Sequence, residues 1–137
     1  MKYTIDELYD ALCWRPTGEI PPEVIEAAME IRNLHVFVQP MLNPPEKSKS
    51  VWDGCAMILA RHSDEELEPH LLRLLEWLQD LNWPGAFTIR ERLLDMHRKY
   101  LQFCLEYSIR QAQKLDDEPW LYWLTEFQQE YDARHAE

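Results

Sequence analysis

Glycine, paired cysteine and long apolar segments are what this sequence lacks. Its three glycines are isolated from one another, so no glycine-rich loop is present to cradle a phosphate. Cys13, Cys55 and Cys104 are odd in number and widely spaced, which argues against a disulfide framework and a zinc site. A transmembrane helix needs about 20 consecutive apolar residues, and no apolar run in this sequence is that long. The start of the chain also lacks the apolar core of a signal peptide. We therefore expect a cytoplasmic protein in a reducing compartment, with no membrane partner.

Positive charge is also scarce. The chain has 14 lysines and arginines against 25 acidic residues, a formal net charge of −11. The excess of acids is larger in residues 63–137 than in residues 1–62. Such a surface repels phosphate backbones, so we expect no nucleic-acid partner. Acidity first promotes solubility, and the alternative is that one acidic face attracts a basic protein.

Aromatic residues are abundant in turn. The chain contains six Trp, six Tyr and four Phe, and 46% of its residues are apolar. This composition excludes disorder. It provides enough apolar side chains for the core of a single domain over residues 1–137. No strand-like alternation occurs, so the fold class predicted is all-α.

Four helices are predicted in the first part of the chain. Thr4 and Glu7 form a capping box, Pro21 and Pro22 suit a first turn, and a third helix follows at about residues 49–62. Ser63 caps the fourth, while residues 15–18 and 43–50 read as loops. The residues placed inward are Ile5, Leu8, Tyr9, Leu12 and Cys13; Val24, Ala28, Ile31, His35 and Val38; Val51, Cys55, Ile58 and Leu59; and Leu67, Leu71, Leu74, Leu75 and Leu78.

The second part of the chain turns at a tryptophan-rich corner. Asn82 is predicted to cap the fifth helix, with Trp83-Pro84 as its first turn. One apolar register continues to Lys114, and a second register suits a break at residues 97–99. We favour the break because helices of about thirty residues are uncommon. The inward residues are Ala86, Ile89, Leu93 and Met96, then Leu101, Cys104, Leu105 and Ala112.

A last helix is predicted after Asp116 and Asp117, which cap it, with Pro119 in its first turn. Its inward residues are Trp120, Leu124, Phe127 and Tyr131. Residues 133–137 are expected to fray.

The inner stripes repeat along the chain. The stripe that runs from Val24 to Val38 superimposes on Leu67 to Leu81 at an offset of 43, and Leu74 to Leu81 superimposes on Trp120 to Phe127 at 46. Such periods are typical of HEAT and armadillo proteins. The predicted architecture is a short, right-handed stack of about three antiparallel helical hairpins, an α-α superhelix.

The string LLEWLQDLNWPGA at residues 74–86 resembles the signature of a bacterial family catalogued as domain of unknown function 5071 (DUF5071). Residues 116–124, an acidic cap followed by tryptophan, resemble that family's second motif. The resemblance covers residues 64–124 as a family-like core and leaves residues 1–62 outside it. It implies a HEAT-like, all-helical fold, and it implies no activity and no catalytic residues. Residues 96–99 depart from the glycine-containing loop that family members have there.

The residues that could act in catalysis do not occur in catalytic sequence motifs. His35, His62, His70 and His97 lie on or beside apolar stripes without metal-ligand spacing, and we interpret them as structural. The serines have no nucleophile motif, and Cys55 lies on an inner face, where cysteines are inert. We therefore expect no enzyme, no cofactor and no metal.

Arg90, Arg92, Arg98 and Lys99 form a basic cluster. It is explained by ion pairing along a helix or, alternatively, by a site for a small acidic ligand. The second explanation gives the alternative function, a small-ligand sensor or cryptic enzyme that uses His35, His62 or His97 beside the cluster.

The tryptophans give the leading functional hypothesis. Trp77, Trp83 and Trp123, with Asp80, either pack between hairpins or line a recognition surface. We predict these four as partner-binding residues of a non-enzymatic protein-interaction module with an acidic surface and a basic partner. By analogy alone, an immunity or adaptor protein fits this description. The sequence leaves the partner and the oligomeric state open.

Overall fold

The computed structural model describes residues 3–12, 20–38 and 51–136, and every regular element in these ranges is a helix. The all-α prediction is confirmed, and these ranges contain no strand. The α-helices are α1 (Ile5–Leu12), α2 (Pro22–Met29), α3 (Trp52–Ala60), α4 (Asp64–Leu67), α5 (Leu71–Glu76), α6 (Ala86–Leu94), α7 (Arg98–Lys114) and α8 (Glu118–Arg134). Short 3-10 helices are η1 (Leu34–Phe37), η3 (Glu68–His70) and η4 (Trp77–Gln79). The predicted loops at residues 15–18 and 43–50, and Cys13, lie outside the described residues.

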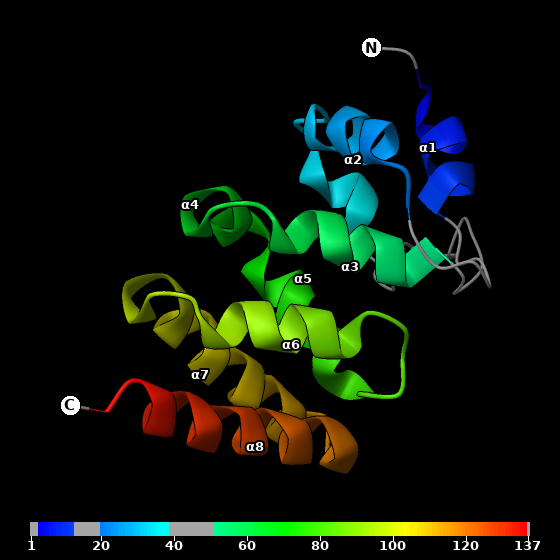
Figure 1. Ribbon diagram of the computed structural model, residues 1–137. Helices are drawn as coiled ribbons and strands as arrows, with labels where there is room; N and C mark the ends of the chain where they lie inside the picture. Colours follow the sequence, from blue (N-terminus) through cyan, green and yellow to red (C-terminus); the bar gives the residue numbers. More distant parts are fainter. Residues whose placement is uncertain (1–2, 13–19, 39–50, 137) are drawn as a thin grey trace.

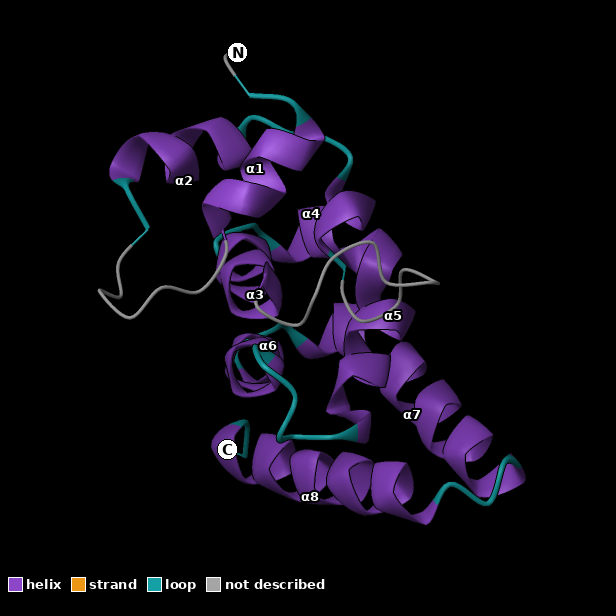
Figure 2. Ribbon diagram, turned by 90° about the vertical axis from the view of Figure 1, so that its right-hand side faces the viewer, coloured by secondary structure: helices purple, strands orange, loops and turns teal. Residues whose placement is uncertain are grey.

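The helices lie in layers. In Figure 1, α1 and α2 lie at the top, and α3, α6 and α8 follow one below another. The view from the side in Figure 2 shows α3 and α6 end-on, with α4, α5 and α7 beside them. Helix α3 packs on α6, α6 on α8, and α7 on both α5 and α8. Each layer therefore covers the apolar face of the next.

Helix starts follow the predicted caps. The Thr4 backbone N–H donates to Glu7 Oε1 at 2.8 Å, and the Glu7 N–H donates to Thr4 Oγ1 at 3.1 Å. Ser63 and Glu66 form the same reciprocal box before α4. The Asp117 side chain accepts from the Trp120 N–H and starts α8. Local sequence is sufficient to predict these helix starts, because a capping side chain binds backbone N–H groups that have no partner within the helix.

The predicted second helix is too long. Helix α2 ends at Met29, and the chain is non-helical until η1. Asn33 starts η1, because its side chain accepts from the His35 N–H at 3.2 Å. His35 is exposed and not inward, while Val38 is buried all the same. The proposed repeat at an offset of 43 therefore fails beyond Met29.

The fourth helix is also interrupted, although its leucine stripe is correct. Pro69 has no N–H and cannot continue an α-helix, so the chain runs through α4, η3 and α5. Leu67, Leu71, Leu74, Leu75 and Leu78 are nevertheless all buried.

The break near residue 97 is confirmed. Helix α6 ends at Leu94 and α7 begins at Arg98, after His97, whose Nδ1 accepts from the Lys99 N–H at 3.0 Å. A continuous helix would have buried Phe103, which is 69% exposed, whereas Leu101 and Leu105 are buried instead.

The end of the chain is held more firmly than predicted. Helix α8 continues through Arg134, past the point where fraying was expected. Arg134 Nη2 lies 3.2 Å from Glu91 Oε1, and His135 Nε2 lies 2.7 Å from the Leu94 carbonyl. The His135 ring also stacks on Tyr131 at 4.0 Å. Contacts to α6 thus anchor both residues.

Helix α1 approaches α3 closely at one glycine. A Cβ on Gly54 would lie 2.7 Å from the Leu12 carbonyl oxygen, closer than real contacts allow. Leu8, Tyr9 and Leu12 are buried there, and the Tyr9 hydroxyl donates to the Val36 carbonyl at 2.6 Å. The amino-terminal helices are therefore part of the same core.

Candidate functional site

Three tryptophans meet at the corner between η4 and α6. Trp52, from α3, lies edge-on to Trp77 at 6.5 Å and to Trp83 at 5.8 Å between ring centroids. The Trp77 Nε1–H donates to the Pro84 carbonyl at 3.2 Å. Trp77 is fully buried and Trp83 partly buried, so the aromatic rings join α3 to the corner.

The predicted cap at this corner is wrong. Helix α6 begins at Ala86 after Gly85, which has φ +84°, and Trp83-Pro84 lies in the preceding turn. Asn82 does not cap the helix; its N–H donates to Asp80 Oδ1 at 2.8 Å. Asp80 therefore organises the turn as an Asx motif, and only glycine fits easily at the left-handed position.

The four predicted partner-binding residues do not form one exposed surface. Trp77 belongs to the core, so packing is the correct interpretation for it. Asp80 and Trp83 are partly buried in the corner. Trp123 is partly buried on α8, where its ring lies 4.9 Å from that of Tyr122.

The basic cluster makes ion pairs between helices as well as contacts along one helix, where Arg90 Nη1 lies 3.4 Å from Glu91 Oε2. Arg90 Nη2 lies 3.1 Å from Glu130 Oε1, and Arg98 Nη1 lies 3.1 Å from Asp132 Oδ1, both on α8. The Lys99 ammonium lies 5.1 Å from the centre of the Tyr100 ring. These groups have partners within the chain, which weakens the case for a site that binds a small acid.

Arg92 and Asp64 form the most enclosed of these pairs. Arg92 Nη2 lies 2.7 Å from Asp64 Oδ1 and 2.9 Å from the His62 carbonyl. Burial alone would raise the pKa of Asp64, but the His97 backbone N–H and the Arg92 guanidinium together hold that pKa below its ordinary value. The pair thus joins α6 to the start of α4, and the bond from His97 joins Asp64 to the residue before α7.

The histidines serve separate roles. His62 is buried, with Nδ1 at 3.2 Å from Glu66 Oε1, while His35 is exposed and His97 caps α7. Burial lowers the pKa of His70, and the charge of His35 lowers it further. His62 and His70 line a groove of about 540 Å³ between α4–η3 and the segment that follows α2. Among the described residues, no three His, Cys, Asp or Glu side chains are placed to hold a metal ion.

A different groove lies between α5 and α7. It has a volume of about 320 Å³, and we call it the α5–α7 groove. Two of its lining residues, Ser108 and Trp120, are buried. The full lining is Leu72, Arg73, Glu76, Tyr107, Ser108, Gln111, Leu115 and Trp120.

Exposed apolar side chains surround this groove. Leu72 is 40% exposed, Leu115 is 65% exposed, and Phe103 stacks on Tyr107 with ring centroids 6.4 Å apart. Sequence reasoning missed the groove, although α7 carries two apolar registers. Once Leu101 and Leu105 take the core, Phe103 and Tyr107 are left outside it.

The lining of the groove has one acidic side chain, Glu76, and one basic side chain, Arg73, and Glu76 is partly buried. Burial raises the pKa of Glu76, and Arg73, at 3.8 Å, opposes that shift only in part. Burial raises the pKa of the Cys104 thiol, and the negative charge of Glu68 raises it further. Both effects favour the neutral thiol of Cys104, and neither Cys104 nor Glu68 is part of the groove lining.

Comparison with protein families yields one match. The model described as "Domain of unknown function (DUF5071)" matches residues 46–136. The chain belongs to the DUF5071 family. The matched region begins earlier and ends later than the 64–124 core predicted from the motifs. No curated protein and no solved structure matches the chain.

The DUF5071 region distinguishes the two grooves. Every residue of the α5–α7 groove lies inside it, whereas Met29, Glu30, Ile31, Arg32 and Leu34 of the histidine-lined groove lie outside it. The α5–α7 groove is therefore built entirely from residues of the DUF5071 region. Within the described residues, no helix is long and apolar enough to cross a bilayer.

Proposed function

We propose that this DUF5071 protein is a non-enzymatic protein-interaction module with an acidic surface, and that it binds its partner at the α5–α7 groove. The observation that carries the proposal is the cluster of exposed apolar side chains from two elements around that groove. Soluble proteins keep such side chains scattered unless a surface is used for binding. Aromatic side chains also supply much of the binding energy in protein interfaces.

A short HEAT-like stack is the architecture that we propose for this role. The succession of α3, α6 and α8 supports it (Figure 1). Stacked helix pairs present extended surfaces to a protein partner. One concrete version, by analogy, is a cytoplasmic immunity or adaptor protein that covers a basic toxin in a bacterium.

The polar residues support binding more than catalysis. Arg90, Arg92 and Arg98 each pair with a carboxylate of the chain. A catalytic base must reach its substrate with a free nitrogen or oxygen; Nδ1 of His97 is engaged in a local contact, and Nε2 of His62 has no partner among the described residues but is buried.

The alternative function, a small-ligand sensor, is favoured by the groove that His62 and His70 share. A thermal-shift screen of small acids and amines tests it, with His70→Ala as the matched variant. A ligand that stabilises the wild type and fails to stabilise the variant would support this alternative.

Affinity capture from the native host tests the interaction module. The tagged protein is expected to retain one basic protein in about equal amount, and the purified pair is expected to reassociate in calorimetry. If no protein is retained above the level of a tag-only control, the proposal is wrong.

A further inference from the structure

We infer that the α5–α7 groove receives a basic amphipathic helix of a partner protein, with its apolar side chains on Leu72, Phe103 and Tyr107 and a lysine or arginine at Glu76. The inference rests on the proposed function and deepens it by naming the chemistry of the partner.

The spacing of the exposed side chains suits a helix. Phe103, Tyr107 and Gln111 lie on successive turns of α7, about 6 Å apart along its axis. Leu72 and Glu76 are likewise four residues apart on the opposite wall, in α5. A helix that lies in a groove presents its anchors at the same interval, at i, i+4 and i+7.

The excess of acids over the whole chain, a net charge of −11, favours a basic partner. Glu76 is a partly buried carboxylate, with 30% of its side chain exposed, and Arg73 approaches it only to 3.8 Å. Because burial raises the pKa of Glu76, part of its hydration is already lost. An arriving ammonium or guanidinium group restores that lost interaction.

Other occupants of the groove fit less well. A second copy would bring a further charge of −11 to a chain that already carries −11, and like charges oppose association. An anionic membrane is repelled for the same reason. Both remain outcomes of the test below.

The probe is a fluorescent peptide of leucine and lysine, about 18 residues long, with the leucines on one face of the helix. Its control has the same composition in an order that spreads the leucines around the helix, so that charge is identical. Fluorescence anisotropy with the full chain is expected to show at least about tenfold tighter binding of the amphipathic peptide.

Matched variants locate the binding site. Phe103→Ser and Glu76→Gln are each expected to weaken binding of the amphipathic peptide, the first by about tenfold. Phe87→Ser is the control, because Phe87 is 62% exposed on α6 and lies outside the α5–α7 groove. Circular dichroism establishes that each variant is folded.

Four results would overturn the inference. They are equal binding of the two peptides, an equal effect of Phe87→Ser and Phe103→Ser, a concentration-dependent dimer that Phe103→Ser abolishes, or flotation with zwitterionic lipid vesicles that Phe103→Ser abolishes. Each leaves affinity capture from the host as the separate test of the proposed function. If a captured partner binds the Phe103→Ser and Glu76→Gln variants as tightly as the wild type, only the inference about the groove is refuted.

Discussion

Gly85 allows the tryptophan corner to close. Its φ of +84° is in the region that side chains disfavour, and a Cβ there would lie 2.8 Å from Ala56 Cβ and 2.8 Å from the Trp52 carbonyl oxygen. Trp77 packs on the other side, with Cζ2 at 3.1 Å. Conformation and space therefore both require glycine at this position.

The substitution Gly85→Ala is expected to lower the free energy of unfolding by about 2–4 kcal/mol, because it adds backbone strain to a steric clash. Urea denaturation followed by tryptophan fluorescence measures it. Asn82→Ala, at the position where the sequence suggested a cap, is expected to stay within about 0.5 kcal/mol of the wild type. The reverse order of the two variants would contradict this account of the corner.

Asp64 gives the stability a dependence on pH. Its pKa in the folded chain lies below the ordinary value of 3.8. The folded state therefore binds the proton more weakly than the unfolded state does. The stabilisation is present above the unfolded pKa and is lost as the pH falls through the folded pKa.

Asp64→Asn is expected to lower stability near neutral pH by about 2 kcal/mol, because a charged acceptor for Arg92 and for the His97 N–H is lost. It is also expected to flatten the fall of stability in acid. Urea unfolding at a series of pH values from about 3 to 7 checks both effects. The control is Asp95→Asn, whose side chain is 76% exposed, and an equally large effect there would refute the assignment.

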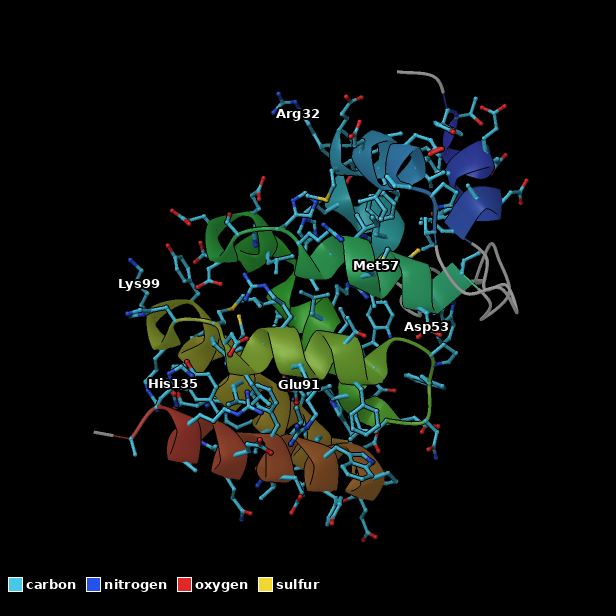
Figure 3. All side chains as sticks on the ribbon, viewed as in Figure 1. Arg32, Asp53, Met57, Glu91, Lys99 and His135 are labelled. Atoms are coloured by element: carbon cyan, nitrogen blue, oxygen red, sulfur yellow. The ribbon has the colours of Figure 1, made fainter. Side chains whose placement is uncertain are left out.

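Side chains join successive elements by binding helix-end carbonyls. Arg92 donates to the His62 carbonyl after α3, and the Tyr131 hydroxyl donates to the Met96 carbonyl after α6 at 2.5 Å. His135 reaches the Leu94 carbonyl at the end of the same helix. Figure 3 labels His135, which follows α8. The carbonyls at a helix end have no partner within the helix, so the next layer supplies one.

Tyr131→Phe is expected to destabilise the chain by about 1–2 kcal/mol, because it leaves a buried carbonyl without its donor while the aromatic packing is kept. Tyr122→Phe removes the same hydroxyl from a side chain that is 56% exposed and is expected to change stability by less than about 0.5 kcal/mol. Thermal unfolding of the two variants measures the difference in stability. Equal midpoint temperatures would show that the bond to Met96 does not stabilise the folded chain.

Sequence periodicity predicted which faces are buried better than where helices end. The leucine stripe from Leu67 to Leu78 is buried although Pro69 divides the helix, because the core selects side chains on one face. Asn82 was predicted to cap α6 because its side chain suits that role. The turn instead depends on Asp80 and on contacts from α3 to Gly85. Those contacts join residues distant in the sequence, and local patterns do not contain them.

One wall of the α5–α7 groove could be predicted in part from sequence periodicity. The apolar register that continues to Lys114 includes Phe103 and Tyr107 and is visible in the sequence. It suggests a single long helix as the alternative to the break, because periodicity cannot tell an exposed apolar stripe from a buried one. The wall that Leu72 and Glu76 supply depends on how α5 packs against α7, which the sequence does not state.

At the scale of the whole molecule, the net charge of −11 and the apolar groove act together. Raising the salt from about 0.1 M to about 1 M shortens the Debye length from about 10 Å to about 3 Å. The affinity for the amphipathic leucine–lysine peptide is therefore expected to fall with salt, and to fall less steeply in Glu76→Gln. Anisotropy titrations at several salt concentrations measure both slopes. Equal slopes would mean that Glu76 does not meet the cation.

The most direct test of the central claim, that the chain acts by binding a protein at the α5–α7 groove, is quantitative mass spectrometry of proteins captured from the native host. It compares the wild type with Phe103→Ser and Phe87→Ser, which remove similarly exposed rings from different helices. The account predicts one basic protein that the wild type and Phe87→Ser retain and that Phe103→Ser loses. Capture of no protein, or equal retention of the same protein by both variants, would contradict it.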